Sequence, residues 1–426
     1  MKASMSIVVA AMLATTAVPA AAAQSAKSAS AATFSINKAR IDRALAQMVS
    51  SGRIAGAEAL IYKGGREVYF GSAGFADREA KRLIRRDTLF QIFSMTKPVT
   101  GVALMQLWED KRFGLDDPLF KYLPEYAQTK VFAGMDASGK PILKAPDRPI
   151  LVRDILRHTA GFSYGPGDTY PEKIFAQVEP LNLNEDLSAF SRKNATVPLQ
   201  FEPGTQWRYS VAVDVQAALI EKLTGTTLEQ YVRSHILDPL GMKETGWTQP
   251  AERYARLATP YEVVDGKLVR QPEAAIKRMN FSGAKLTMGG AGLVSSIDDY
   301  MRFARMLLGK GSYNGVRLLK PSTVKLMATD HLDARVTERQ WLGSKGSGGF
   351  GFDFFVRTAQ PQTAAENRGA LGEFFWDGAM TTLFWIDPAN DLAAVFLVQK
   401  QPFDGTLHHD FREAVYGPSY LGPKGD

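Results

Sequence analysis

Segments typical of β-strands occur at both ends of this 426-residue chain, and the long stretch between them is mostly typical of helix. Residues 56–62 and 67–74 are strand-like runs on either side of Gly64-Gly65, which is the pattern of a β-hairpin. Three more aromatic and β-branched runs lie near the C-terminus, at 349–356, 380–386 and 392–398. We therefore expect an α/β (α+β) fold, in which an antiparallel sheet built from both chain ends is flanked by helices and carries an inserted, mostly helical domain.

The length of the chain exceeds that of a usual single hydrophobic core, and this predicts two lobes. We expect residues 24–98 and 309–426 to form the sheet domain, and residues 99–308 to form the mainly helical domain. Helices are expected at 36–49, 99–110, 152–158, 213–223, 298–308 and 407–415. A cleft between two lobes is the default location of a functional site.

Residues 1–23 have the pattern of a secretory signal peptide. Lys2 precedes an apolar stretch from Ile7 to Ala20, and small residues follow at 21–23. The apolar stretch is too short to span a membrane comfortably. We expect an exported protein, periplasmic or secreted, with no stable membrane insertion after cleavage.

The absence of cysteine excludes disulfides, zinc–thiolate sites, iron–sulfur clusters and thiol nucleophiles. The net charge of +7 is dispersed along the chain, and this does not predict a nucleic-acid partner. The histidines lack the spacing of metal ligands, so no metal is expected. The glycine-rich segment at 289–292 has no preceding strand or acidic partner, so no cofactor is expected either. Serine becomes the first candidate for a nucleophile.

One serine lies in a Gly-x-Ser-x-Gly pattern, at residues 161–165. In α/β-hydrolases this pattern needs a strand before it and a helix after it. Here the preceding segment, 152–158, reads as helix, and Pro166-Gly167 begins a loop. The context therefore argues against Ser163 as the nucleophile.

A second serine chemistry uses Ser-x-x-Lys, because a lysine one helical turn after the serine lies on the same face. If burial or neighbouring charge keeps its amine neutral, the lysine can accept the hydroxyl proton. The pattern occurs at Ser35–Lys38, Ser94–Lys97, Ser282–Lys285 and Ser322–Lys325. Ser35 and Ser322 are expected to cap surface helices. Only Ser94 follows an apolar strand-like entry and leads into a long apolar helix, so it is the candidate nucleophile, with a role as helix cap the alternative.

The segment from Phe93 to Pro98 resembles the first motif of the serine β-lactamase and penicillin-binding-protein superfamily. Four further segments resemble those of its class C-like branch and occur in the right order, at 154–161, 201–210, 289–299 and 376–379. The resemblance spans residues 34–416 and implies a β-lactamase/transpeptidase-like fold.

This resemblance also implies roles for individual residues. Lys97 and Tyr209 would share the proton transfers, and either could be the base. The backbone N–H groups of Ser94 and Ala379 would form the oxyanion hole. His158 is instead expected to end a helix and bond its last carbonyls.

The departures from the superfamily pattern concern substrate choice. Ser210-Val211 follows Tyr209 where class C enzymes have Tyr-x-Asn, and Trp376-Asp377-Gly378 replaces their Lys-Thr-Gly. Loss of that lysine removes a cation that would attract a carboxylate, whereas tryptophan favours neutral, apolar groups. This pattern is similar to the family VIII carboxylesterases, although Asp377 departs even from theirs. Trp376 and Gly378 are therefore expected to bind substrate, with edge-strand packing the alternative for Trp376.

We expect a serine hydrolase that cleaves small-molecule carboxylic esters with short acyl chains through an acyl-enzyme on Ser94. A β-lactamase, DD-peptidase or other amide hydrolase on the same scaffold is the alternative. A second alternative is a non-catalytic, penicillin-sensor-like binding protein. The presence of all three residues Ser94, Lys97 and Tyr209 argues against it.

Overall fold

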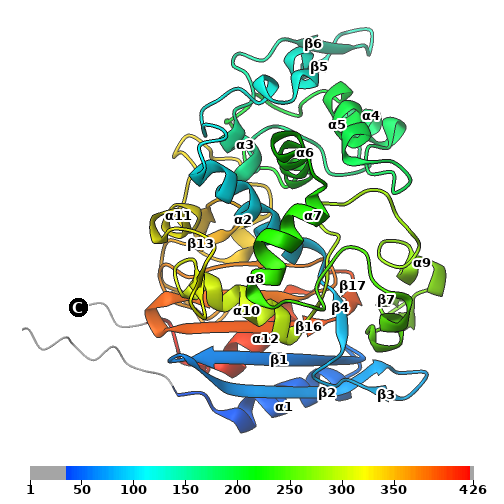
Figure 1. Ribbon diagram of the computed structural model, residues 1–426. Coiled ribbons are helices and arrows are strands. Elements are labelled where there is room, and N and C mark those ends of the chain that lie inside the picture. The colour runs from blue at the N-terminus through cyan, green and yellow to red at the C-terminus, as the bar shows by residue number, and fades with distance from the viewer. Residues whose placement is uncertain (1–34, 423–426) are drawn as a thin grey trace, which may run out of the picture.

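The computed structural model describes residues 35–422, and an eight-stranded sheet forms its base (Figure 1). The strand order is β12-β13-β14-β15-β16-β1-β2-β3, and neighbouring strands are antiparallel. The strands are β1 (Gly56–Lys63), β2 (Arg66–Asp77), β3 (Arg82–Leu83), β12 (Gly348–Phe350), β13 (Phe355–Arg357), β14 (Phe374–Asp377), β15 (Leu383–Asp387) and β16 (Leu392–Val398). The two chain ends meet where β1 pairs with β16, with Ala59 opposite Phe396, so the expected single sheet from both ends is confirmed.

Helices cover both faces of this sheet. Every residue of β16 is buried, as its continuous apolar sequence requires of a strand packed on both faces. Phe396 of β16 stacks on Phe411 of α12 (Gly405–Tyr416), whereas Phe384 of β15 meets Tyr300 of α10 (Ile297–Leu308) on the other face. The first helix, α1 (Lys38–Ser50), packs beside α12 under β1 and β2 (Figure 1).

The region between the two ends is mainly helical, as expected. Its central helix, α2 (Thr96–Glu109), is buried on nearly all sides, which explains its uniformly apolar sequence. The other helices of the chain are α3 (Val152–Leu156), α4 (Tyr170–Val178), α5 (Leu187–Thr196), α6 (Ala212–Thr224), α7 (Leu228–Val232), α8 (Asp238–Leu240), α9 (Glu273–Lys277) and α11 (Pro321–Met327). Among the described residues, no helix is long and apolar enough to cross a membrane.

Small sheets complete the fold. The most important for the site pairs β4 (Leu89–Gln91) with β9 (Val294–Ser296). The others join β5 (Val131–Met135) to β6 (Pro141–Lys144), β10 (Ser312–Tyr313) to β11 (Val316–Arg317), and β7 (Tyr261–Val264) to both β8 (Lys267–Arg270) and β17 (Lys400–Gln401). The domain boundaries expected from the sequence remain predictions. The expected helical domain includes α10, which packs against the sheet. The expected signal peptide lies outside the described residues.

Three strand predictions near the C-terminus are wrong in detail. Residues 349–356 form two strands, because the chain reverses where Gly351 N donates to Phe354 O and Asp353 is left-handed (φ 61°). The run at 380–386 becomes a strand only at Leu383, after a turn with left-handed Thr381 (φ 66°). The segment at 376–379 was expected to lie just before an edge strand, but the strand after it, β15, pairs with both β14 and β16.

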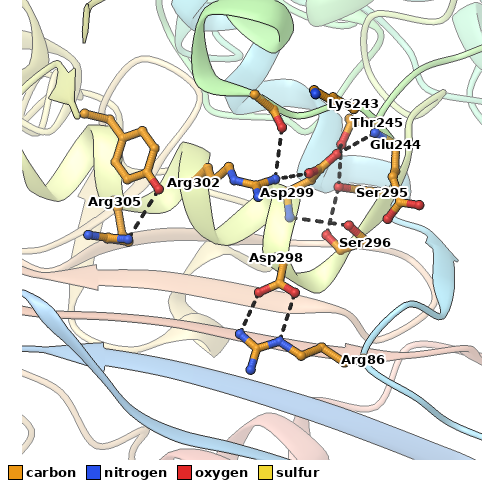
Figure 2. Close-up of polar contacts among 12 residues, drawn as sticks. Arg86, Lys243, Glu244, Thr245, Ser295, Ser296, Asp298, Asp299, Arg302 and Arg305 are labelled. Carbon is orange, nitrogen blue, oxygen red and sulfur yellow. Dashed lines mark hydrogen bonds and ion pairs between the residues drawn. The ribbon is translucent and has the colours of Figure 1, made fainter. Parts of the chain in front are cut away.

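The start of α10 fixes the position of β9 and, through it, of the chain leading to Ser94. Figure 2 shows Ser296 accepting the N–H of Asp299 as the N-cap, and Asp299 accepting from Thr245 (3.0 Å). The next residue of α10, Tyr300, donates its hydroxyl to the carbonyl of Met95 (2.7 Å). The network in Figure 2 therefore ties α10 to β9 through Thr245, and the separate hydrogen bond of Tyr300 ties α10 to the segment that carries Ser94.

Replacing Ser296 by alanine is expected to lower the free energy of unfolding by about 1 kcal/mol, because it removes the N-cap bond of α10. Urea denaturation measures this change. The control is Ser50→Ala at the exposed end of α1, which is expected to stay within about 0.5 kcal/mol of the native protein. Equal midpoints for the native protein and Ser296→Ala would show that the cap is not stabilising.

Candidate active site

Ser94 lies at the entrance to α2, within a 3₁₀ turn at Phe93–Met95. The chain bends there because Phe93 is left-handed (φ 44°) directly after β4 and Ile92. Lys97 follows one turn later, and its Nζ lies 3.2 Å from Ser94 Oγ. Ser94 does not cap α2: the N-cap residue is Met95, with no side-chain cap bond, so the alternative of a helix-capping role is wrong.

Lys97 is completely buried below Ser94. Its Nζ donates to the carbonyl of Gly290 (2.8 Å), which lies in the glycine-rich turn before β9. Burial lowers the pKa of Lys97 to about 8, against the opposing influence of the Asp214 and Asp353 carboxylates. A substantial fraction of this amine is therefore neutral near pH 8, which is what a proton acceptor for the serine requires.

Tyr209 comes from the loop before α6 and faces the same two side chains. Its ring covers Lys97 Nζ at 4.6 Å from the centroid, and its hydroxyl is hydrogen-bonded to Ser94. The Trp376 indole N–H also donates to this hydroxyl (3.4 Å). Burial raises the pKa of Tyr209 well above its usual value, so the phenol is protonated at neutral pH. The structure therefore brings Ser94, Lys97 and Tyr209 together.

A cavity of about 400 Å³ opens above Ser94 and contains the other substrate-site residues expected from the sequence. It is lined by Ser94, Tyr209, Trp341, Ser344, Lys345, Trp376, Asp377, Gly378, Ala379 and Phe403. Within residues 35–422, no hydrogen-bond acceptor is found for the N–H of Ala379, which leaves this donor available to a ligand. A side chain at Gly378 would clash with the Ile92 carbonyl at 2.5 Å, which explains the glycine there.

The other candidates from the sequence lie outside this cavity. Ser163 is buried in a loop, where its Oγ accepts from Gln200 (2.9 Å), and helix rather than strand precedes it, as expected. The expected capping roles of Ser35 and Ser322 are wrong, because Asn37 and Lys320 occupy those N-cap positions.

The expected role of His158 is also wrong in detail. It has a left-handed backbone (φ 56°) just after α3, and neither of its ring nitrogens bonds a carbonyl of that helix. Its Nδ1 instead accepts from Ser210 N (3.2 Å), and its ring packs against Tyr209 (centroids 4.9 Å apart). Burial and the nearby charge of Lys97 hold the pKa of His158 well below its usual value, so the ring supports Tyr209 as a neutral group.

Sequence reasoning missed three residues around the site. Tyr164 is hydrogen-bonded to Ser94 and lies within the Gly-x-Ser-x-Gly pattern that was set aside. Asp214 lies beside Lys97 and accepts from the N–H of Gly290 (3.0 Å). Lys345 forms an ion pair with Asp377 at the wall of the cavity. Asp214 and Lys345 belong to no local motif, and the pattern that contains Tyr164 points to Ser163 instead.

The described part of the chain contains no group of three or more His, Asp or Glu side chains placed to hold a metal ion. The site presents the Ser94 hydroxyl, the Lys97 amine and the N–H group of Ala379. A serine beside a buried amine, below a cavity with a free N–H donor, can accept an acyl group and stabilise an oxyanion.

The antiparallel sheet with an inserted helical region is the fold of the serine β-lactamases and penicillin-binding proteins. The family model described as Beta-lactamase matches residues 41–416, and the chain belongs to this family. The family is a serine hydrolase family, and it includes esterases and acyltransferases among the relatives of this chain.

Three of the most similar known proteins align with nearly the whole chain. Protein Rv1367c of Mycobacterium tuberculosis is 33% identical over 375 residues, covering 87% of this chain and 91% of that one. Esterase EstB of Burkholderia gladioli is 28% identical over 403 residues, covering 89% and 95%. The solved structure of "EstCE1, a hydrolase with promiscuous acyltransferase activity" has a TM-score of 0.75 at 28% identity, covering 89% and 98%.

Proposed function

We propose that this protein hydrolyses carboxylic esters through an acyl-enzyme on Ser94. The observation that carries the proposal is the 3.2 Å approach of Lys97 Nζ to Ser94 Oγ, with a lysine pKa of about 8. Ser94 Oγ attacks the ester carbonyl while neutral Lys97 takes the hydroxyl proton, and a C–O bond forms. The alcohol then leaves with a proton, and water attacks the acyl-enzyme in the same way to release the acid.

Tyr209 is suited to deliver the proton to the leaving alcohol. Its raised pKa keeps the phenol protonated, and the ammonium formed on Lys97 beneath its ring can replace the proton it gives up. We therefore assign the base to Lys97 and the acid to Tyr209. The N–H groups of Ser94 and Ala379 would bind the oxyanion.

The size and lining of the cavity favour small, neutral substrates. Trp341, Trp376 and Phe403 supply apolar walls, and its volume of about 400 Å³ is at the small end for ligand sites. These features favour esters with short acyl chains over large peptides. The likeness to esterase EstB agrees with this choice.

The proposal is tested by assaying the purified protein on 4-nitrophenyl esters of increasing acyl length beside one chromogenic cephalosporin. We expect short-chain esters to be turned over well above the cephalosporin, and intact-mass spectrometry to detect the acyl-enzyme. Turnover of the cephalosporin as fast as that of the best ester would instead favour the β-lactamase or amide hydrolase alternative.

Replacing Tyr209 by phenylalanine is expected to lower kcat for ester hydrolysis by roughly 10²- to 10³-fold, because it removes the proton donor. The loss is expected to be smaller for esters whose leaving group is a weak base, since they need less protonation. Comparing 4-nitrophenyl acetate with ethyl acetate measures the difference. Equal losses on the two esters would contradict the role of Tyr209 as the acid.

Acyl transfer to an alcohol is a second candidate, favoured by the likeness to EstCE1, which is described as a hydrolase with promiscuous acyltransferase activity. In that reaction an alcohol replaces water as the acceptor from the Ser94 acyl-enzyme. Adding 1-butanol to a vinyl acetate assay and measuring butyl acetate against acetate would give the partition.

We also propose that the protein is exported. The support is the pattern of residues 1–23, which lie outside the described part of the chain. N-terminal sequencing of the mature protein from a bacterial host is expected to begin near Gln24; a start at Met1 would contradict export by cleavage.

A further inference from the structure

The wall of the cavity contains a buried ion pair whose two members come from distant segments. Asp377 ends β14, and Lys345 ends a 3₁₀ turn at Leu342–Lys345. Lys345 Nζ donates to Asp377 Oδ2, and the two side chains are only 8% and 10% exposed. The pair therefore stands between the apolar cavity above Ser94 and a second cavity lined partly by His408.

Aromatic rings surround the ammonium of Lys345. Its Nζ lies 5.1 Å from the ring centroid of Trp341, 5.2 Å from that of Trp376 and 4.9 Å from that of Phe403. Three ring faces and one carboxylate form the kind of cage that recognises a cation. Here the chain itself fills the cage with a tethered ammonium.

Lys345 also restores a cation that the local sequence lacks. Trp376-Asp377-Gly378 has no lysine, yet Lys345, which lies 32 residues before Asp377 in the sequence, places an ammonium in the cavity wall. Asp377 cancels its charge, so the wall carries both signs and no net charge. His408 also lies beside the pair, with its Nδ1 4.0 Å from Asp377 Oδ2, and burial lowers its pKa to about 4, so it adds no charge at neutral pH.

We propose that the Lys345–Asp377 pair sets the charge of the substrates that the cavity accepts, so that the intact pair selects uncharged esters. This inference rests on the proposed ester hydrolysis and specifies its substrate class. Removing the carboxylate leaves an unpaired ammonium that attracts anionic substrates. Removing the ammonium leaves an aromatic cage with a carboxylate that attracts cationic ones.

The test compares Asp377→Asn, Lys345→Ala and the double variant with the native protein. Each is assayed on esters matched in shape but differing in charge. The anionic arm pairs mono-4-nitrophenyl succinate with its methyl ester on the acyl side, and 4-acetoxybenzoate with its methyl ester on the alcohol side. The cationic arm pairs acetylthiocholine with S-(3,3-dimethylbutyl) thioacetate. The readout is the ratio of kcat/KM within each pair, which cancels any general loss of activity.

Asp377→Asn is expected to raise the anionic-to-neutral ratio at least about tenfold in one of its two arms, which also identifies the side of the substrate held in the cavity. Lys345→Ala is expected to raise the cationic-to-neutral ratio by a similar factor of about ten. The double variant should return both ratios to within about threefold of the native protein, because charge–charge effects of contacting groups are coupled. Ratios that stay within twofold in both single variants would overturn the proposal.

A binding measurement separates this inference from the proposed reaction. Benzoate and phenyltrimethylammonium are titrated into each protein, with intrinsic tryptophan fluorescence, to which Trp341 and Trp376 in the cavity wall contribute, as the readout, and no turnover is needed. If the native protein hydrolyses no ester, the proposed function fails, yet opposite shifts in the affinities of the two ions would still support charge selection. Unchanged affinities in both single variants would contradict it. Because the two variants are independent, misfolding of one leaves the other as a test.

Discussion

Alanine in place of Ser94 is expected to lower kcat/KM for a short-chain 4-nitrophenyl ester by on the order of 10⁵-fold, because it removes the nucleophile of the covalent step. Lys97 Nζ donates to this hydroxyl, and the hydroxyl is also hydrogen-bonded to the Tyr209 phenol. The methyl group of alanine also leaves the cavity open, so substrate binding should be retained. Steady-state kinetics measure the loss, and intact-mass spectrometry should show no acyl adduct.

Ser163→Ala is the matched control, since Ser163 is also a buried serine close in sequence to site residues. It loses one hydrogen bond from Gln200 but touches neither Lys97 nor the cavity, so its kcat/KM is expected to change by less than about tenfold. Ester hydrolysis by Ser94→Ala at the native rate would exclude Ser94 as the nucleophile. Loss of activity only in Ser163→Ala would point to the other serine motif.

Local sequence patterns were sufficient for three central strands of the sheet, β1, β2 and β16, and for the position of Ser94. The hairpin of β1 and β2 follows from two strand-like runs around Gly64-Gly65, and β16 follows from an uninterrupted apolar run. Ser94 could be separated from three other Ser-x-x-Lys spacings because the helix after it is apolar on every side. A helix of that kind must be buried, and its first turn must then lie inside the protein. Tyr209, in contrast, was found only through a family resemblance.

The features that sequence reasoning missed depend on backbone conformation or on contacts between distant residues. Asp353 and Thr381 adopt left-handed backbone without the glycine that usually signals it, so two turns were read as strand. The ion pair of Lys345 with Asp377 joins a turn to a strand end, and no periodicity links such positions. This ion pair matters for function, because it places an ammonium in the wall of a site whose local motif lacks a lysine.

The pH dependence of ester hydrolysis is expected to follow Lys97. Burial lowers its pKa to about 8, and only the neutral amine can take the serine proton, so kcat/KM should rise with pH and level off above about 8. Asp214→Asn keeps an oxygen for the Gly290 N–H but removes a negative charge that raises this pKa. The midpoint of the profile should therefore move to lower pH in that variant. A midpoint that stays fixed, or moves upward, would show that another group titrates.

Methionine in place of Lys97 should fill the same space without a proton acceptor and lower kcat by roughly 10³- to 10⁴-fold, while the rise near pH 8 disappears. Lys325→Met is the control, because Lys325 has the same spacing from a serine but is exposed on α11, so its kinetics should be unchanged. Both variants change the lysine of a Ser-x-x-Lys pattern, one buried at the site and the other exposed on the surface. If Lys97→Met retained the rise near pH 8, Tyr209 would be the base. The raised pKa of Tyr209 argues instead for its role as the acid.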